Sequence, residues 1–516
     1  MIKKINKNYL EKLYILFLGI ISSFSLPPYN YWFICFFSFS LLFVFLLKNK
    51  NNNYKLFFVY GYIFGFGYFI SNLYWIPLSL LHDNELKILI PIAIILIPAF
   101  LSLFYSFAFL TFKLLLNSKS TFINILSFSL VLSLFEFIRG TVLSGFPWNL
   151  FAYSLSENIE FIQITSLIGI FTFNTILITI YVSPSILFLN KKKIDLLGFF
   201  FVIILIVSNY VYGSLKVKNF QNLKTEILPA EIKVLSTSIP IERFYSNIDE
   251  EKILIKLIEM SSPIQNKNTI FIWPEGVIPN INLKNLKDEY YYLFKKSFFE
   301  NHKIILGIND DQIQNEKKFF YNSLSIIDNE ANAVYKYYKN KLVPFGEFLP
   351  LENVLSKIGL KSLTNNYQSY TPDTNRTLFD FGKNNKIKIL PLICYEIIYS
   401  GNLSKDNDYN FIVNISEDGW FGESIGPYQH FAHSIFRSVE YGKYTLRSSN
   451  NGISAIIDPS GSIINKININ QEGVISIKEI VSVDKTFFSI YGNKIYFCII
   501  LLYIFLIFSF KKLENE

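Results

Sequence analysis

Long apolar runs and one mixed polar block alternate along this chain of 516 residues. The apolar runs crowd into roughly the first 213 residues and the last 30. Because about 20 consecutive apolar residues cross the hydrocarbon core of a bilayer, each long run predicts a transmembrane helix. The pattern predicts eight spans, near residues 9–26, 32–47, 56–80, 88–116, 121–138, 160–189, 194–212 and 487–510.

Short β-rich runs separated by turns fill the polar block. Strand patterns occur at 269–273, 303–307, 323–327, 387–393 and 411–413, with a hairpin over 453–464. Helical patterns lie near 247–261, 284–300 and 427–447. Alternating strands and helices, together with hairpins, indicate an α/β or α+β sandwich. We therefore expect a seven-helix transmembrane region at 1–213, a globular domain at 214–485, and a last transmembrane helix with its tail at 486–516.

Lysines mark every second loop between the predicted spans. They are Lys3, Lys4, Lys7, Lys48, Lys50, Lys55, Lys113, Lys119, Lys191, Lys192, Lys193, Lys511 and Lys512. Because basic loops remain in the cytoplasm, this distribution predicts cytoplasmic termini. Seven spans precede the polar block, so the block is expected on the outer face of the membrane.

Composition strengthens the membrane interpretation. Residues of the hydrophobic type make up 51% of the chain and aromatic residues 18%, too many for an ordinary soluble protein. The net charge of +8 comes from lysines beside apolar segments, and no basic stripe interleaved with aromatics indicates nucleic-acid binding. The first span follows lysines as a signal peptide would, but no small-residue cleavage site follows it, so we interpret it as a membrane helix.

Three residues with reactive side chains stand out in the polar block. Glu275 ends Trp273-Pro-Glu, Lys339 precedes Leu342-Val-Pro-Phe-Gly-Glu347, and Cys394 ends the apolar run 387–393. Singly, each has an ordinary explanation: a surface carboxylate, a solvated lysine and a buried, inert thiol. Together they suit acyl transfer, because a carboxylate can accept the thiol proton, an ammonium can stabilise an oxyanion, and a thiol can carry the acyl group.

Other polar residues fit structural roles better. His430 and His433 are three residues apart, whereas helical zinc pairs are usually four apart, so we interpret them as helix and pocket residues rather than metal ligands. Cys35 and Cys498 lie in apolar segments, which leaves Cys394 without a disulfide partner in its own domain. We expect no metal and no soluble cofactor.

The three motifs together resemble the nitrilase, or carbon–nitrogen hydrolase, superfamily with its Glu-Lys-Cys triad. The flanking membrane segments resemble one branch of it, the apolipoprotein N-acyltransferases. Further motifs carry that resemblance over nearly the whole chain: Gly145-Phe-Pro-Trp148, Asp418-Gly-Trp-Phe-Gly422, Gly426-Pro-Tyr-Gln-His430 and Leu446-Arg-Ser-Ser-Asn-Asn-Gly452.

The resemblance implies an αββα sandwich on an eight-helix bundle. It implies that Glu275 is the general base, Lys339 the oxyanion stabiliser and Cys394 the nucleophile. It also implies that Glu347 supports the lysine, while Tyr395 and Glu396 shape the pocket.

The implied reaction has two steps and needs no cofactor. Cys394 takes an acyl chain from a membrane phospholipid, and the α-amine of a diacylglyceryl-cysteine lipoprotein then attacks the thioester. The implied partners are these two lipids, with no nucleic acid, and the protein is expected to be a monomer. Residues 348–372 are hypothesised to act as a lid that excludes water.

Three positions depart from the family pattern. The family usually has Asn where Glu417 stands, and a Gln-Gly-Asn-like turn and a Trp in the region of Leu235-Ser-Thr-Ser238-Ile-Pro240 and Phe244. Phenylalanine keeps an aromatic surface, so we expect an altered substrate fit rather than lost chemistry.

Two other functions remain open at this point. A membrane-tethered amidase acting on small amides would use the same triad, and a degenerate scaffold would keep the fold without catalysis. Retention of Glu275, Lys339 and Cys394 together argues against the scaffold. A transporter would need paired intramembrane charges and broken-helix repeats, which the sequence lacks.

Overall fold

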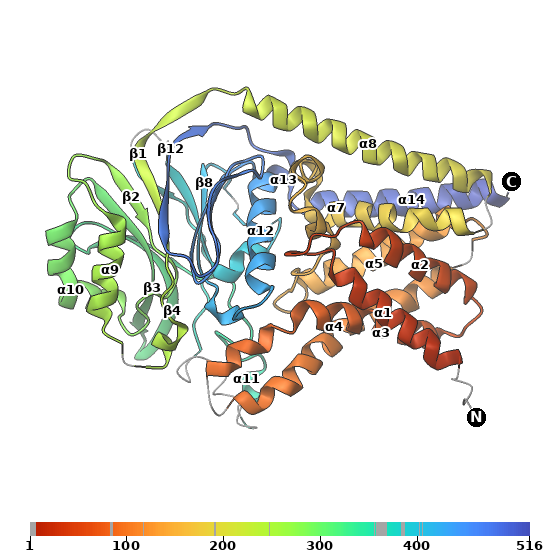
Figure 1. Cartoon of the computed structure of the whole chain (residues 1–516), viewed down its shortest axis with the longest axis horizontal. Helices are drawn as coiled ribbons and strands as arrows, with labels where there is room; N and C mark the ends of the chain where they lie inside the picture. Colours follow the sequence, from red (N-terminus) through yellow and green to blue (C-terminus); the bar gives the residue numbers. More distant parts are fainter. Residues whose placement is uncertain are drawn as a thin grey trace. The chain divides into compact units, whose positions relative to one another are not determined.

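The chain divides into two compact units (Figure 1). The computed structural model describes residues 7–82, 86–116, 118–189, 192–246, 248–355, 357, 369–382, 387–401, 403–404 and 406–515. Unit 1 comprises residues up to Leu78, Ile88–Asn219 and Thr486 onward; unit 2 comprises Ser79–Lys87 and Phe220–Lys485. Lys3, Lys4, Lys191 and residues 356 and 358–368 of the hypothesised lid lie outside the described residues.

Unit 1 is built of helices. The longer ones are α1 (Lys7–Ser23), α2 (Ile34–Lys48), α3 (Tyr54–Leu73), α4 (Ile90–Leu115), α5 (Thr121–Thr141), α7 (Thr165–Val182), α8 (Lys193–Gln221) and α14 (Lys494–Asn515). Shorter helices of this unit are η3 (Phe151–Leu155), α6 (Ile159–Ile162), η4 (Ser183–Phe188) and α13 (Phe487–Tyr491). Two further short helices, η1 (Ile76–His82) and η2 (Lys87–Leu89), lie partly in the segment Ser79–Lys87 that belongs to unit 2. Of the described helices, six are long and apolar enough to cross a membrane. The chain thus has the membrane helices that its hydropathy predicts, while the count of eight spans stays a prediction.

Two predicted spans have different limits in the structure. The run 56–80 is helical only to Leu73 and continues as the 3₁₀ helix η1, which contains Pro77. The run 160–189 is interrupted at Gly169, whose φ of 71° breaks α7. A Cβ at Gly169 would lie 2.1 Å from the Phe488 ring, so the glycine lets α13 pack closely there. Hydropathy does not record the break at Gly169, because it depends on Phe488, a packing partner distant in sequence.

Unit 2 contains two six-stranded sheets. The first has the order β12-β1-β2-β3-β4-β5 and the second β11-β10-β9-β8-β7-β6. The strands are β1 (Thr225–Ser236), β2 (Thr269–Ile272), β3 (His302–Gln314), β4 (Lys317–Ile327), β5 (Ala333–Tyr338), β6 (Phe379–Asp380), β7 (Lys388–Ile393), β8 (Phe411–Glu417), β9 (Tyr444–Asn450), β10 (Ser454–Ile457), β11 (Ile463–Ile467) and β12 (Gly473–Val481). Neighbours pair in parallel from β1 to β3 and from β7 to β9.

The two sheets share one core, and helices cover their outer faces. Ile272 and Ile305 of the first sheet and Ile393 and Val413 of the second belong to the same buried cluster. Helices α9 (Glu250–Ser261) and α10 (Leu283–Ser297) share a second buried cluster with the first sheet, and α12 (Gly426–Tyr441) packs on β9 and β10 (Figure 1). Strands covered on both faces read as continuous apolar runs, as Thr269–Ile272 does. The predicted αββα sandwich is confirmed.

The predicted helix at 427–447 is wrong in its last turns. Helix α12 ends at Tyr441, and Gly442 has a φ of 63°, the left-handed conformation that terminates many helices. Strand β9 begins at Tyr444, is wholly buried and pairs in parallel with β8. The apolar residues after Gly442 therefore belong to a central strand, which single-sequence periodicity cannot separate from a buried helix.

Candidate active site

Cys394 lies at a sharp turn where β7 ends and the 3₁₀ helix η9 (Cys394–Ile398) begins. Its φ of 46° is unusual for a residue with a side chain and marks local backbone strain. The amide groups of Ile393 and Asn414 hold this turn: the Ile393 N–H donates to Glu396 Oε2 at 2.9 Å, and Asn414 Nδ2 donates to the Cys394 carbonyl at 3.4 Å. The turn fixes the position of the thiol at the carboxyl end of a buried strand.

Glu275 lies just beyond β2 and is buried. Its Oε1 accepts a hydrogen bond from Asn322 Nδ2 at 2.8 Å, and its Oε2 accepts one from the Glu417 backbone N–H at 3.0 Å. Gly307 of β3 allows this placement, because a Cβ there would lie 2.5 Å from the Glu275 Cα. Both carboxylate oxygens are thus held by neighbouring strands.

Lys339 follows β5 and is only 1% exposed. Its Nζ donates to Glu347 Oε1 at 2.8 Å and to Glu275 Oε1 at 3.4 Å. Glu347 is fixed in turn, since its Oε2 accepts the Val343 N–H at 2.8 Å. One ammonium therefore bridges two buried carboxylates, and Asn322 Nδ2 donates to both of them.

Glu396 connects the lysine loop to the cysteine turn. Its Oε1 accepts the backbone N–H groups of Asn340 at 3.0 Å and Lys341 at 3.2 Å. Arg376 forms an ion pair with the same oxygen at 2.6 Å. The Glu396 carboxylate therefore holds the loop that follows Lys339 and the segment that contains Arg376. Tyr395 is buried beside it, with its ring 5.5 Å from that of Tyr399.

A polar cluster supports the turn from the side of β8 and α12. Arg447 donates to both oxygens of Asp418, at 2.7 and 3.0 Å, and Ser416 Oγ donates to Asp418 at 2.7 Å. His430 Nε2 lies 3.3 Å from the Cys394 carbonyl, and its Nδ1 lies 3.1 Å from Arg447. Burial and the Arg447 charge lower the pKa of His430. His430 Nδ1 also lies 3.0 Å from Asp418 Oδ1, so the imidazole ring joins the Asp418–Arg447 pair to the Cys394 carbonyl.

Cys394, Asp418 and His430 also bring three potential metal-ligand atoms within 4.8 Å of one another. The surroundings do not favour a cation there. Although burial opposes its ionisation, Asp418 has its pKa lowered because Arg447 and His430 lie beside it. Arg447 already supplies the positive charge that a metal would bring, and its donors occupy both carboxylate oxygens.

A buried ion pair joins the Glu275 loop to the end of β8. Arg243 NH2 pairs with Glu417 Oε2, both side chains being 1% exposed or less, and Arg243 Nε donates to the Gly276 carbonyl at 2.9 Å. Asn450 Nδ2 donates to the same Glu417 oxygen at 2.7 Å. Glu417, where the family usually has Asn, thus has a cationic partner. Phe244 and Trp420 form an aromatic contact beside this pair, with centroids 4.9 Å apart.

The charges of the site set the protonation of the thiol. Burial raises the pKa of Cys394 well above its ordinary value, the charge of Glu275 raises it further, and Lys339 opposes both. Burial also raises the pKa of Glu275, which Lys339 partly offsets. Burial disfavours the ammonium of Lys339, but its two carboxylate partners raise its pKa overall. A neutral thiol, a proton-accepting carboxylate and a fixed cation are the groups that nucleophilic acyl transfer needs.

The sequence-predicted residues Glu275, Lys339, Glu347 and Cys394 lie together, linked by hydrogen bonds or by electrostatic interaction. Sequence reasoning missed Asn322, Asn414 and Arg447. Arg447 stands within a motif that the sequence analysis quoted, so that signal was present. Asn322 and Asn414 lie inside strands with no flanking pattern, and only the pairing of distant strands gives them their roles.

Comparisons with known proteins agree over nearly the whole chain. The family model "apolipoprotein N-acyltransferase N-terminal domain" matches residues 18–182, and the model "carbon-nitrogen hydrolase" matches residues 240–484. A protein of Rickettsia prowazekii (strain Madrid E) named apolipoprotein N-acyltransferase is 32% identical over 503 residues, covering 94% of this chain and 95% of that protein. One of Rhodopseudomonas palustris with the same name is 30% identical, covering 89% of this chain and 87% of that protein.

Solved structures of carbon–nitrogen hydrolases are also similar. An amidase from Neterenkonia sp. AN1 shares 10% identity and a TM-score of 0.32, covering 50% of this chain and 95% of that chain. Saccharomyces cerevisiae Nit3, a member of branch 10 of the nitrilase superfamily, shares 16% identity and a TM-score of 0.33. The match covers 49% of this chain and 90% of that chain.

Proposed function

This chain belongs to the apolipoprotein N-acyltransferase family, and we propose that Cys394 carries a fatty acyl chain, as a thioester, from a membrane phospholipid to a lipoprotein amine. The protein is an acyltransferase of the inner membrane. The observation that carries the proposed mechanism is the position of Lys339. Its Nζ lies 2.8 Å from Glu347 and 3.4 Å from Glu275, and its charge acts to lower the pKa of the Cys394 thiol.

In the first step, Glu275 accepts the Sγ proton of Cys394 as the sulfur attacks the ester carbonyl of a phospholipid. The negative charge that develops on the carbonyl oxygen is stabilised by Lys339, which its carboxylate partners keep protonated. Collapse of the tetrahedral intermediate breaks the ester bond. The departing alkoxide takes the proton from Glu275 and leaves as a lysophospholipid, with the acyl group bound to sulfur.

In the second step, the acceptor is the free α-amine of an N-terminal diacylglyceryl-cysteine. The amine nitrogen attacks the thioester carbonyl, Glu275 takes a proton from it, and Lys339 again stabilises the oxyanion. Expulsion of the sulfur returns the proton to Cys394 and yields the amide. A thioester reacts with amines more readily than an ester does, so two steps replace one difficult one.

The raised pKa of Glu275 supports its proposed role. A base that must hold a proton in one half-reaction and release it in the same cycle works best when its pKa is close to the operating pH. Burial moves the Glu275 pKa upward in that direction. The raised pKa of the thiol makes such a base necessary, since little thiolate is present without it.

We also propose the topology that the basic loops predict, with unit 2 on the periplasmic face, both termini in the cytoplasm and a monomeric protein. Exposed lysines at each location offer a test. A membrane-impermeant thiol reagent should label Lys256→Cys on α9 in intact spheroplasts. It should label Lys512→Cys on α14 only after the membrane is permeabilised, and the reverse pattern would contradict the orientation.

The acyl-enzyme is tested by intact mass measurement. The purified full-length protein, incubated with phospholipid, should gain the mass of one acyl chain on Cys394, and hydroxylamine should remove it. Cys394→Ala should gain none, whereas Cys35→Ala should behave as the unaltered protein. An adduct that persists in Cys394→Ala, or an active preparation without an adduct, contradicts the proposal.

A further inference from the structure

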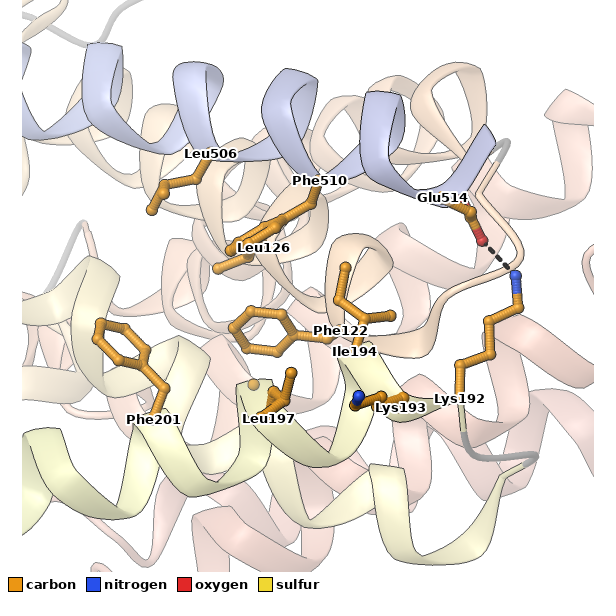
Figure 2. Close-up of a pocket in the computed structure, with 11 residues that line it drawn as sticks. Phe122, Leu126, Lys192, Lys193, Ile194, Leu197, Phe201, Leu506, Phe510 and Glu514 are labelled. Atoms are coloured by element: carbon orange, nitrogen blue, oxygen red, sulfur yellow. Dashed lines mark hydrogen bonds and ion pairs between the residues drawn. The ribbon is translucent and has the colours of Figure 1, made fainter. Parts of the chain in front are cut away.

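Unit 1 contains a cavity of about 630 Å³ that the acyl-transfer reaction does not use. It lies between the first turns of α8 and the last turns of α14, with α5 behind them (Figure 2). Helix α8 continues into unit 2 at its other end, whereas α14 follows α13 within unit 1. The volume falls within the range of about 300–1,000 Å³ that is usual for small-molecule sites.

The walls of the cavity are apolar. In Figure 2, Phe122 and Leu126 of α5 lie between Leu197 and Phe201 of α8 on one side and Leu506 and Phe510 of α14 on the other. The rings of Phe122 and Phe510 are 6.0 Å apart. The helical rise of about 1.5 Å per residue makes the α8 wall, from Lys193 to Phe201, roughly 12 Å long. An extended hydrocarbon chain fits the shape and chemistry of such walls.

Specific contacts fix the α8 wall. The buried Asp195 accepts hydrogen bonds from Ser120 Oγ at 2.6 Å and from the Phe122 N–H at 2.8 Å. Gly198 lets α8 approach Phe122, because a Cβ there would lie 2.3 Å from the ring. The beginning of α8 is therefore anchored to α5, although most of its other side chains are exposed. A groove with anchored walls retains its shape when a lipid enters or leaves.

The mouth of the cavity is positively charged. Lys192 forms an ion pair with Glu514 at 2.7 Å, and Ser118 Oγ donates to the same carboxylate at 2.6 Å, so the Glu514 charge is compensated. Lys193 is exposed, lines the cavity and has no ion-pair partner among the described residues. Lys119 and Lys512, both exposed, adjoin this mouth in sequence. A cation above an apolar groove matches a phosphate head group above an acyl chain.

We propose that this groove binds a phospholipid with a net negative head group, with one acyl chain along Phe122 and Phe510 and its phosphate beside Lys193. The lipid is a resident of the helix bundle rather than an acyl donor. An anionic lipid is favoured over a zwitterionic one because each lysine near a head-group surface contributes about fivefold in affinity for it.

Native mass spectrometry of the full-length protein in detergent tests this site. The probes are phosphatidylglycerol and phosphatidylethanolamine with the same acyl chains. We expect phosphatidylglycerol to bind about fivefold more tightly, the contribution of one lysine beside the head group. Lys193→Glu should remove that difference, and Leu197→Trp, which fills the groove, should remove the tight binding itself.

Two matched controls should leave the tight binding unchanged. Lys494→Glu makes the same charge change at the opposite end of α14, and Leu196→Trp adds the same ring to an exposed position on α8 outside the cavity. Equal binding of the two lipids, or tight binding that survives both Lys193→Glu and Leu197→Trp, overturns the proposal. A lipid-free dimer that Leu197→Trp dissociates also overturns it, since a second copy would then fill the groove.

Discussion

At the scale of single residues, the site depends on one cation held between carboxylates. Lys339 stabilises charge on Glu275, on Glu347 and on a thiolate at Cys394. Glu347 has no role in proton transfer in this mechanism, but its charge affects the base. Because Glu347 raises the pKa of Glu275 by repulsion, the two carboxylates are electrostatically linked.

Glu347→Gln should therefore shift the pH dependence of acylation. Glu275 must be deprotonated to accept the thiol proton, so the rate of acyl-enzyme formation falls as pH drops through the raised Glu275 pKa. Removing the negative charge of Glu347 lowers the pKa of Glu275. The decline of the acylation rate on the acid side of its pH profile should therefore move to lower pH. The measurement is the single-turnover rate of Cys394 acylation against pH, with Glu352→Gln as the matched control. A shift to higher pH would contradict the assigned electrostatics.

The sequence predicted these residues better than their surroundings. Glu275 and Lys339 follow β2 and β5 of the first sheet, and Cys394 follows β7 of the second, so the packing of the two sheets on one core brings the thiol to the other two side chains. Glu396 is predicted to shape the pocket beside the thiol, and the structure adds that its carboxylate accepts hydrogen bonds from the backbone of Asn340 and Lys341. Such bonds join residues more than 50 positions apart, and no local pattern encodes them.

At the scale of elements, close approach of strands and loops sets the site. The Glu275 loop rests on Gly307 of β3, and Arg243 ties the same loop to β8 through the Gly276 carbonyl and Glu417. Breaking a buried ion pair by removing one partner leaves an uncompensated charge, so Arg243 and Glu417 are expected to change together in relatives. This pairing gives a physical account of Glu417, which the sequence marked only as a departure.

Gly307→Ala should disable the enzyme through packing alone. The new methyl group would lie 2.5 Å from the Glu275 Cα, which is backbone, so the loop must move. We expect the acylation rate to fall at least 100-fold, because small displacements of catalytic groups have effects of about that size. The free energy of unfolding should fall by about 1–3 kcal/mol, the usual cost of overpacking.

The control for this substitution is Gly382→Ala. No atom lies within 4 Å of a Cβ built there, so both acylation and the chemical-denaturation midpoint should remain as in the unaltered protein. An equal loss of activity in the two variants would mean that the Gly307 contact does not position Glu275.

Element types were predictable where periodicity and turns agreed. The strands at 269–272 and 388–393 and the helices α9 and α10 lie where the pattern placed them, within a few residues. Strand β9 was hidden inside a predicted helix, because a single Gly442 separates two buried apolar segments. Strands β1, β5 and β12 were missed, and their mixed exposure gives no clean alternation.

At the scale of the whole molecule, the chain combines apolar helices with a carbon–nitrogen hydrolase domain. The hydrolase domain holds a thiol, a carboxylate and an ammonium that would suit an amidase equally well. The membrane helices and the family membership indicate lipid substrates instead. What distinguishes the two reactions is the acceptor of the acyl group, an amine in one case and water in the other.

The most direct test of this account follows the acyl group from Cys394 to its acceptor. The protein is first acylated with a phospholipid, separated from it, and then mixed with a diacylglyceryl lipopeptide that has a free α-amine. We expect the protein to lose the acyl mass while the lipopeptide gains the same mass, and we expect the adduct to persist when water is the only acceptor. Rapid release of free fatty acid, without acylation of the lipopeptide, would contradict it.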